Sequence, residues 1–338
     1  MAEGLAASLL SLALSAIALG VLRAASSRLP HALPNPRSLH GSAIPRAGGW
    51  SIWAGFIPVA MAWPPLFPGG LWGWLPPFAA LILVSARDDA RSMPVAWRLV
   101  VHLAAATWIA AALVLDGGIA DATGSVTPSM LLQGIAIVLV VAWSLNLYNF
   151  MDGSDGLAAC MTITGFGAYA AASALGSRVE PAYLALGVAV LPFLAVNRPA
   201  ATMFMGDVGA VPLGFLAAGF GLAGVVQGVW PAWFPLLVFL PFWGDASVTL
   251  IRRLMQRERI WEAHRDHYYQ RLVRLGAGHL GTLALYGVWM LATALCALWF
   301  LARAPGLGYV GLLAWVIVAG ALFAIIDYHW RRQSRTIP

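Results

Sequence analysis

The sequence has 338 residues, of which 60% are hydrophobic and only 10% are charged, and its formal net charge is +6. This composition excludes a soluble globular domain, which would carry far more charged residues. A membrane helix needs roughly 17–25 mostly apolar residues, and several uncharged stretches reach that length. The chain is therefore predicted to be an all-α polytopic membrane helical bundle.

Turn-forming segments divide the apolar stretches into separate spans. The stretch 47–86 is broken by "PPLFPGGLWG" and the stretch 208–244 by "QGVWP", so each is predicted to form two spans. Tryptophans gather near the ends of spans, as they do in interfacial belts. About eleven spans result: 4–22, 49–65, 71–86, 97–115, 130–147, 157–175, 180–196, 208–226, 231–251, 281–303 and 308–328.

The basic residues are distributed unevenly along the chain. All 20 are arginines, and only Arg178 and Arg303 lie in the even-numbered connections. Because cytoplasmic loops carry an excess of Arg and Lys, the odd-numbered loops and the C-terminus are predicted to be cytoplasmic and the N-terminus outside. The first apolar run lacks a basic n-region and is long for a signal peptide, so we expect a retained span. Cys160 and Cys296 lie within spans and have neither metal-binding nor disulfide spacing.

The residues suited to chemistry lie in the odd-numbered, cytoplasmic loops. These loops lie near 23–48, 87–97, 148–156, 197–207 and 252–280. We expect them to form one site within a single integral membrane domain. The chain shows no convincing internal repeat, which argues against a transporter built from inverted halves.

Five aspartates lie at the cytoplasmic edges of spans: Asp88, Asp89, Asp152, Asp155 and Asp207. An unpaired carboxylate at a membrane boundary is costly, so it usually has a cation or a metal as its partner. Each aspartate could instead cap a helix, Asp152 or Asp155 before span 157–175 and Asp207 before span 208–226. The set as a whole favours a metal site. Oxygen ligands without thiolates favour Mg²⁺, with Mn²⁺ as the alternative.

The loop near 252–280 is basic. It places His264, Arg265 and His267 within four residues, and at helical spacing the two histidines would share one face. Guanidinium groups bind phosphate oxygens bidentately, so this loop, with Arg37 and Arg46, is interpreted as a phosphate-binding site. The alternative is a cationic surface helix that contacts anionic lipid headgroups. Metal, arginines and no obvious Ser or Cys nucleophile together indicate phosphoryl-group transfer.

Isolated polar residues receive structural interpretations. His102, Asp245 and Asp327 are predicted to be packing or boundary residues rather than catalysts. Tyr268 and Tyr269 are interpreted as aromatic residues of an interfacial belt.

Five sequence blocks follow one another along the chain: "NPRSLH" with "PRAGG", "DD" followed by "RL", "NLYNFMDGSDGLA", "NRPAATMFMGDVG" and "HRDHYYQRL". They extend from about Asn35 to Leu272. In this order they resemble the polyprenyl-phosphate N-acetylhexosamine-1-phosphate transferases of bacterial glycosyltransferase family 4. The "NFMDG" and "HRDHYYQRL" wording is most similar to the branch that initiates O-antigen or related surface glycans. The peptidoglycan branch usually has adjacent histidines in the last block.

The resemblance implies a reaction and its partners. Such enzymes transfer N-acetylhexosamine-1-phosphate from a UDP-sugar to undecaprenyl phosphate and release UMP. The implied partners are UDP-N-acetylhexosamine, undecaprenyl phosphate and membrane lipid, without nucleic acid, and the implied cofactor is Mg²⁺. The implied location is the bacterial inner membrane, with the site facing the cytoplasm and the product entering lipopolysaccharide or related cell-wall glycans. The sugar (GlcNAc, GalNAc, FucNAc or QuiNAc) and a homodimer are left open.

The resemblance also implies metal-binding and catalytic residues. Asp207 would bind Mg²⁺, and Asn149 would be a second ligand. Asp88 and Asp89 would act beside the acceptor phosphate, and Asp152 would have a catalytic or orienting role. Direct attack on the sugar-linked phosphorus is favoured, with an aspartyl-phosphate on Asp152 as the alternative.

Substrate-binding residues are carried over in the same way. Phe204 would stack on uracil, and Asp155 and Asn197 would lie near the nucleoside. The remaining residues would hold the diphosphate or the sugar, with an arginine in place of a lysine that some members use: His264, Arg265, His267, Arg37 and Arg46.

Three other functions are considered. A phospho-MurNAc-pentapeptide transferase of peptidoglycan synthesis belongs to the same family. A CDP-alcohol phosphatidyltransferase would cluster its aspartates in one helical run led by Asp-Gly-x-x-Ala-Arg, and the sequence has no such run. An ion-coupled transporter would place acidic residues near span centres, whereas the five motif aspartates lie at span edges.

Overall fold

The computed structural model describes residues 2–32, 43–65, 67–115, 127–176, 180–259 and 264–334. Within these ranges the chain is nearly all helical, apart from a short antiparallel pair of strands. The elements in chain order are α1 (Ala2–Ala24), η1 (Ser26–Arg28), β1 (His31–Ala32), β2 (Ile44–Pro45), α2 (Gly48–Ala62), α3 (Gly70–Ala90), α4 (Val95–Leu115), α5 (Pro128–Met151), α6 (Leu157–Leu175), α7 (Pro181–Asn197), α8 (Asp207–Val226), α9 (Trp233–Val238), α10 (Leu240–Met255), α11 (Tyr268–Leu272), η2 (Val273–Ala277), α12 (Gly278–Arg303), η3 (Pro305–Leu307) and α13 (Gly308–Ser334).

Helices occupy all the predicted spans. Among the described residues, seven segments are long and apolar enough to cross a membrane: α1, α4, α5, α6, α8, α11 with α12, and α13. The other predicted spans correspond to α2, α3, α7 and the pair α9 and α10. The polytopic helical architecture expected from the sequence is therefore confirmed.

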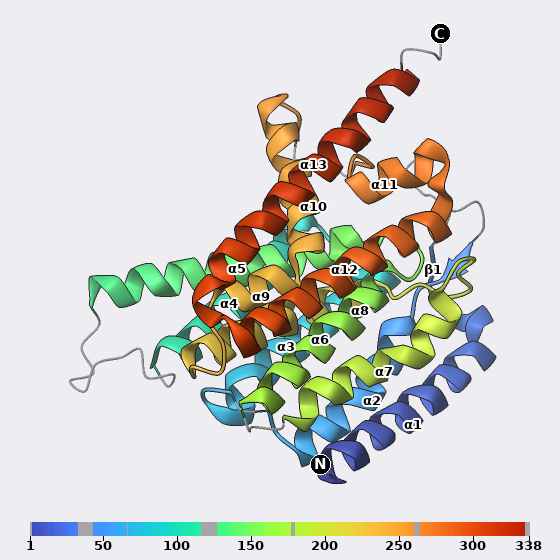
Figure 1. Ribbon diagram of the computed structural model, residues 1–338. Coiled ribbons are helices and arrows are strands. Elements are labelled where there is room, and N and C mark those ends of the chain that lie inside the picture. Colours follow the sequence, from blue (N-terminus) through green and yellow to red (C-terminus); the bar gives the residue numbers. More distant parts are fainter. Residues whose placement is uncertain are drawn as a thin grey trace.

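The predicted span 231–251 is not one continuous helix. α9 ends at Val238, and α10 begins at Leu240 after a break at Phe239. Pro241 lies in the first turn of α10, where a helix tolerates a residue without an N–H group. The break gives α10 its own direction, and its last turns project beyond the bundle (Figure 1).

α8 forms the centre of the bundle. Nearly all its residues are buried, as expected for a helix that is apolar all round, and it packs against α3 and α5. Ser144 Oγ donates a hydrogen bond to the carbonyl of Gly214 at 2.8 Å, which joins α5 to α8. Small residues and interhelical hydrogen bonds commonly join membrane helices in this way. By contrast, α1 exposes Leu5 and Ile17 on its outer face, where lipid would contact them.

The elements that carry the predicted functional residues meet at one end of the bundle. The last turn of α3 contacts the first turn of α8 through Asp89. Backbone hydrogen bonds join the beginning of α2 to the segment before α8, beside β1 and β2 (Figure 1). The beginning of α6 is joined to the end of α7 through Asn197.

Candidate functional site

Asp89, in the last turn of α3, holds the beginning of α8. Its Oδ1 accepts a hydrogen bond from the amide of Asp207 at 3.1 Å, and its Oδ2 from the amide of Val208 at 2.9 Å. Arg46 Nη1 lies 3.4 Å from the same Oδ1. Gly206 has a φ of +77°, and a Cβ added there would lie 2.6 Å from Asp89 Oδ2. Gly206 is the N-cap residue of α8, and the Asp89 carboxylate satisfies the first amides of the helix in place of a capping side chain. Only glycine fits beside it.

Asp88 has a different set of partners from Asp89. Its Oδ1 accepts a hydrogen bond from the amide of Met93 at 2.6 Å, and its Oδ2 lies 2.7 Å from Arg98 Nη1. The same nitrogen lies 3.4 Å from Asp207 Oδ2. Arg98, at the beginning of α4, thus connects two predicted functional carboxylates. It is the arginine of the "RL" block, to which no role was assigned from the sequence.

Asp207, Asn149 and Asp152 lie together. The Asn149 side chain is within hydrogen-bonding reach of the Asp207 carboxylate. Asp152 ends α5, and its backbone amide donates to the Asn149 carbonyl at 3.3 Å. Within the described ranges, no protein group hydrogen-bonds the Asp152 carboxylate, so it remains available to a ligand.

Carboxylates crowd this part of the structure. Burial, followed by the nearby Asp207 charge, raises the pKa of Asp89 to about 7, while Arg46 opposes the rise. Burial also raises the pKa of Asp152 well above its usual range, and Asp207 and Asp89 add to the effect. Like charges held together disfavour ionisation, and a bound cation would reverse that preference.

The donor atoms fit a hard cation that is shared with a substrate. No three His, Cys, Asp or Glu side chains in the described part of the chain converge on a metal position. Asp207, Asn149 and Asp152 offer only oxygen donors. Mg²⁺ usually takes one or two carboxylates from the protein and completes its shell with water and substrate phosphates. The arrangement therefore suits Mg²⁺ bound together with a phosphate-bearing ligand.

Asp155 and Asn197 join loops to one another. Asp155 is buried, and its Oδ2 accepts a hydrogen bond from the Ala201 amide at 3.1 Å. Asn197 Oδ1 accepts from the Gly156 amide at 2.9 Å, and its Nδ2 donates to the Met203 carbonyl at 3.0 Å. Both side chains fix the segment that leads into α8, beside the predicted metal ligands. Their predicted contact with the nucleoside stays a prediction.

Phe204 belongs to a joint made of main-chain atoms, which we call the backbone joint and define as residues 45–49 with 204–209. The Phe204 amide donates to the Pro45 carbonyl at 2.8 Å, and the Gly48 amide donates to the Phe204 carbonyl at 2.9 Å. A Cβ added at Gly49 would lie 2.5 Å from Gly209 Cα, so the two backbones are in direct contact. Phe204 is partly buried, and its predicted stacking on uracil stays a prediction. Arg37 lies outside the described residues.

The histidines of the last block are close together, but not for the predicted reason. α11 begins only at Tyr268, so His264 and His267 precede the helix instead of sharing a helical face. Their rings nevertheless lie 4.9 Å apart, centroid to centroid. Burial lowers the pKa of His264 to about 4, and His267 and Arg253 add to the effect. Arg265 is exposed. A phosphate-binding role for the three stays a prediction.

Asp245, predicted to be a packing or boundary residue, is a fully buried acceptor of several hydrogen bonds. It binds the amide of Tyr268 at 2.9 Å, the amide of Tyr269 at 3.0 Å and the hydroxyl of Tyr286 at 2.5 Å. Both Tyr268 and Tyr269 are buried, so their interpretation as interfacial aromatics is wrong. The sequence signal for this network is a carboxylate within an apolar span.

Asp327 has ionic partners as well. Arg252 lies 3.1 Å and Arg271 2.5 Å from its Oδ1, and the Tyr268 hydroxyl lies 3.2 Å from its Oδ2. Asp327 therefore joins α10, α11 and α13. His102 is buried within α4, as the packing interpretation expects.

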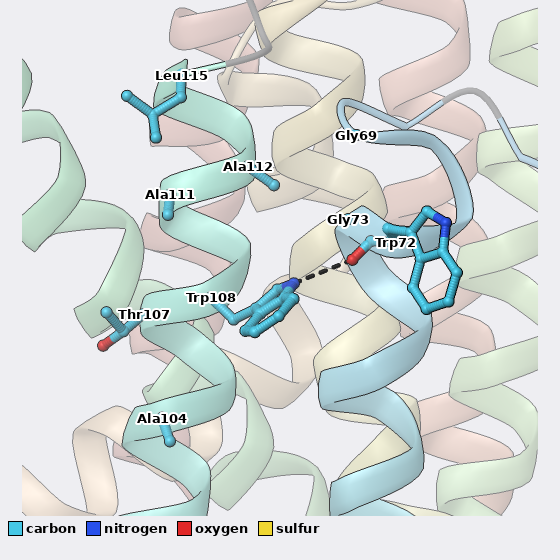
Figure 2. Close-up of a pocket in the computed structure, with 9 residues that line it drawn as sticks. All are labelled: Gly69, Trp72, Gly73, Ala104, Thr107, Trp108, Ala111, Ala112 and Leu115. Carbon is cyan, nitrogen blue, oxygen red and sulfur yellow. Dashed lines mark hydrogen bonds between the residues drawn. The ribbon is translucent and has the colours of Figure 1, made fainter.

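A hollow of about 730 Å³ lies between α3 and α4, away from this group. Trp72 and Trp108 line it together with small residues, and the Trp108 indole donates to the Trp72 carbonyl at 3.0 Å (Figure 2). Trp72 is sixteen residues before Asp88 on α3, about 24 Å along the helix axis. The lining contains no charged side chain, so the hollow is not the site of the chemistry.

Comparison with known proteins adds independent information. The model of glycosyl transferase family 4 matches residues 71–225. A probable undecaprenyl-phosphate N-acetylglucosaminyl 1-phosphate transferase from Bacillus subtilis is 26% identical over 265 residues, which are 75% of this chain and 72% of the relative. The decaprenyl-phosphate N-acetylglucosaminephosphotransferase of Mycobacterium tuberculosis is 26% identical over 309 residues, 81% of this chain and 76% of the relative.

A further relative matches a shorter part. The phospho-N-acetylmuramoyl-pentapeptide-transferase of Thermotoga maritima is 30% identical over 165 residues, 48% of this chain and 52% of that protein. The matched family region contains α3 to α8, and with them Asp88, Asn149 and Asp207. With the five ordered sequence blocks, these matches support glycosyl transferase family 4, and within it the polyprenyl-phosphate N-acetylhexosamine-1-phosphate transferases, as the family that this chain is similar to.

Proposed function

We propose that the protein transfers N-acetylhexosamine-1-phosphate from a UDP-sugar to undecaprenyl phosphate and releases UMP. The observation that carries this proposal is the meeting of Asp88 and Asp207 at Arg98, with Asn149 and Asp152 beside Asp207, at one end of a membrane bundle. The names of the Bacillus and Mycobacterium relatives support the same reaction class. The protein would start a lipid-linked surface glycan, such as lipopolysaccharide.

The proposal includes a membrane topology. About eleven spans would place the N-terminus outside and the C-terminus in the cytoplasm, with the site at the cytoplasmic face of the inner membrane. The support is the arginine distribution, because only Arg178 and Arg303 lie in even-numbered connections. A cytoplasmic site suits a nucleotide-activated sugar made inside the cell.

Asp207 and Asn149 are the proposed Mg²⁺ ligands, with Asp152 beside them. When bound, Mg²⁺ neutralises charge on the diphosphate, so that a second anion can approach it. Asp89 keeps the Asp207 backbone in place through its two amide hydrogen bonds. The arrangement supports a site in which metal and substrate phosphates bind together.

The chemical step needs little proton transfer. A phosphate monoester has a second pKa of about 6, so undecaprenyl phosphate is largely a dianion at neutral pH. One of its phosphate oxygens attacks the sugar-linked phosphorus, and the bond from that phosphorus to the bridging oxygen breaks. UMP leaves with the bridging oxygen and its electron pair. Asp88, paired with Arg98, would orient the acceptor or remove its last proton.

The donor-side residues would act by positioning. His264, Arg265 and His267 would hold the diphosphate or the sugar, and Phe204 would stack on uracil with Arg46 beside it. These contacts hold the reacting atoms in line, and such positioning supplies much of the catalysis in phosphoryl transfer.

A panel of UDP-sugars tests the proposed function. Detergent-solubilised protein is incubated with Mg²⁺, undecaprenyl phosphate and UDP-GlcNAc, UDP-GalNAc, UDP-FucNAc or UDP-QuiNAc, and UMP release is measured. We expect turnover with at least one of them. UDP-MurNAc-pentapeptide forms a separate arm, because the Thermotoga relative favours that alternative. No UMP release from any donor, under conditions in which the protein remains folded, would reject the proposal.

A further inference from the structure

Asp245 is a carboxylate in a place where a carboxylate is costly. It lies on α10, inside the helical membrane bundle, and is 0% exposed. Acidic residues within membrane segments are rare, and they usually mark a functional group with a defined partner. The predicted function assigns Asp245 no role.

The partners of Asp245 come from three helices. Oδ1 accepts from the Tyr268 amide at 2.9 Å and from Thr249 Oγ1 at 3.2 Å. Oδ2 accepts from the Tyr269 amide at 3.0 Å and from the Tyr286 hydroxyl at 2.5 Å. Hydrogen bonds to an ionised acceptor are about twice as strong as neutral ones. The carboxylate thus fixes the start of α11 relative to α10 and α12.

His267 connects this carboxylate to the candidate site. Its Nδ1 lies 3.4 Å from Asp245 Oδ1, so Nε2 is on the opposite edge of the ring. The ring stacks on Phe150, with centroids 5.8 Å apart, and Phe150 follows the proposed ligand Asn149. The Tyr269 hydroxyl donates to the Phe150 carbonyl at 2.9 Å. A continuous set of contacts therefore leads from Asp245 to the end of α5.

We propose that Asp245 is a positioning residue that holds His267 with Nδ1 toward itself and Nε2 toward the diphosphate of the sugar nucleotide. The proposal rests on the proposed function and deepens it by assigning the orientation of one donor-binding group. A carboxylate beside one ring nitrogen fixes the orientation of an imidazole. The Nδ1 edge of His267 would then stay against Asp245, and the Nε2 edge would face a diphosphate oxygen.

A double-mutant cycle separates this role from a merely structural one. Asp245→Asn, His267→Gln and the double variant are compared, with kcat and KM measured separately for the UDP-sugar and for undecaprenyl phosphate. Each single change is expected to lower kcat/KM for the UDP-sugar about 10- to 100-fold, the size of effect that follows the loss of a group that orients a metal-binding histidine. The double variant should be within about twofold of His267→Gln. The KM for undecaprenyl phosphate should not change.

Asp327→Asn is the matched control. Asp327 also binds the last block, through Arg271 and the Tyr268 hydroxyl, but none of its hydrogen bonds or ion pairs involves His267. Its effect should therefore multiply with that of His267→Gln. If the effects of Asp245→Asn and His267→Gln also multiply, or if Asp245→Asn changes KM for both substrates equally, the positioning role is rejected.

Two further measurements keep the test decisive. If Asp245→Asn does not fold, Tyr286→Phe replaces it, because Tyr286→Phe removes one hydrogen bond and leaves the carboxylate. The effects of Tyr286→Phe and His267→Gln on kcat/KM are again expected not to multiply. The ¹⁵N shifts of the His267 ring, assigned with His267→Gln, should change in Asp245→Asn or Tyr286→Phe. Unchanged shifts would overturn the proposal. This readout needs no turnover, so it remains decisive even if the UDP-sugar panel rejects the proposed function.

Discussion

The carboxylate of Asp89 binds the backbone amide of Asp207 at 3.1 Å, although the two residues are 118 positions apart in the chain. The adjacent Asp88 instead lies 2.7 Å from Arg98. Two neighbouring aspartates therefore have separate tasks: one fixes the backbone of a predicted metal ligand, and the other faces a cation at the site.

This difference predicts separate consequences for the two substitutions. Asp89→Ala should lower the free energy of unfolding by about 0.5–2 kcal/mol, the usual effect of losing a side chain that caps the first amides of a helix, and should reduce turnover by displacing Asp207. Asp88→Asn should change stability less but lower kcat about 100-fold or more, if Asp88 moves a proton or orients the acceptor. Thermal unfolding in detergent and initial rates distinguish them. Equal losses of stability would contradict the assignment.

Asp207→Asn should abolish turnover and leave membrane insertion intact. An amide is a weaker ligand than a carboxylate for a hard divalent cation, and Asp207 is the carboxylate that Asn149 and Arg98 both approach. Removing divalent cations from the wild type should stop UMP release, and adding Mg²⁺ should restore it. Near-normal activity in the variant, or turnover that persists in excess chelator, would contradict the metal assignment.

Arg98→Gln should weaken binding of the acceptor. The guanidinium lies between Asp88 and Asp207, where it can also pair with an incoming phosphate. Losing one charge-assisted hydrogen bond costs about 1.5–3 kcal/mol, so the KM for undecaprenyl phosphate should rise roughly 10- to 100-fold. Arg91→Gln removes an exposed arginine from the connection that precedes α4 and serves as the control. The same KM in both variants would show that Arg98 does not contact the acceptor.

The lowered pKa of His264 predicts that the stability of the folded protein depends on pH. This pKa is lowered from 6.5 to about 4, chiefly by burial, so between these values the unfolded state binds more protons than the folded state. The free energy of unfolding should therefore fall as the pH drops from 6.5 toward 4, by about 1–3 kcal/mol from this group. His264→Gln should flatten that slope, while His329→Gln, at an exposed position, should not. Equal slopes in all three proteins would disprove the prediction.

The number of chemical steps can be measured by isotope exchange. Direct attack by the acceptor needs undecaprenyl phosphate in the site, so labelled UMP should not enter the UDP-sugar when the lipid is absent. A covalent phosphate on Asp152, whose carboxylate has no hydrogen-bond partner in the described part of the chain, would allow that exchange. Exchange that disappears in Asp152→Asn would establish the two-step route.

The helices could be predicted from the sequence because length and apolarity are local properties. The break at Phe239 was missed, although Pro241 just after it was a usable signal for the start of a new helix. The strand pair of β1 and β2 was also missed, because each strand has only two residues and its pairing depends on distant segments.

The residues that form the site could be predicted from the sequence more readily than the contacts between them. Asp88, Asn149, Asp152 and Asp207 do lie together, as their shared position at span edges suggested. The amide partners of Asp89 come from a segment more than a hundred residues away, and no local pattern predicts such a contact. Arg98 was visible in the sequence, but its role depends on the distance to Asp207.

The backbone joint has a consequence for how members of such a family can diverge. Its hydrogen bonds join main-chain atoms of residues 45–49 to those of Phe204 and Met205, so side chains there contribute little to the alignment of the two segments. Gly49 and Gly209 are exceptions, because any side chain would separate the two backbones. Phe204 can therefore be exchanged during evolution, or by design, while the joint stays intact, whereas Arg46 is also paired with Asp89. New donor specificities could then arise by single substitutions at Phe204, without a compensating change elsewhere in the fold.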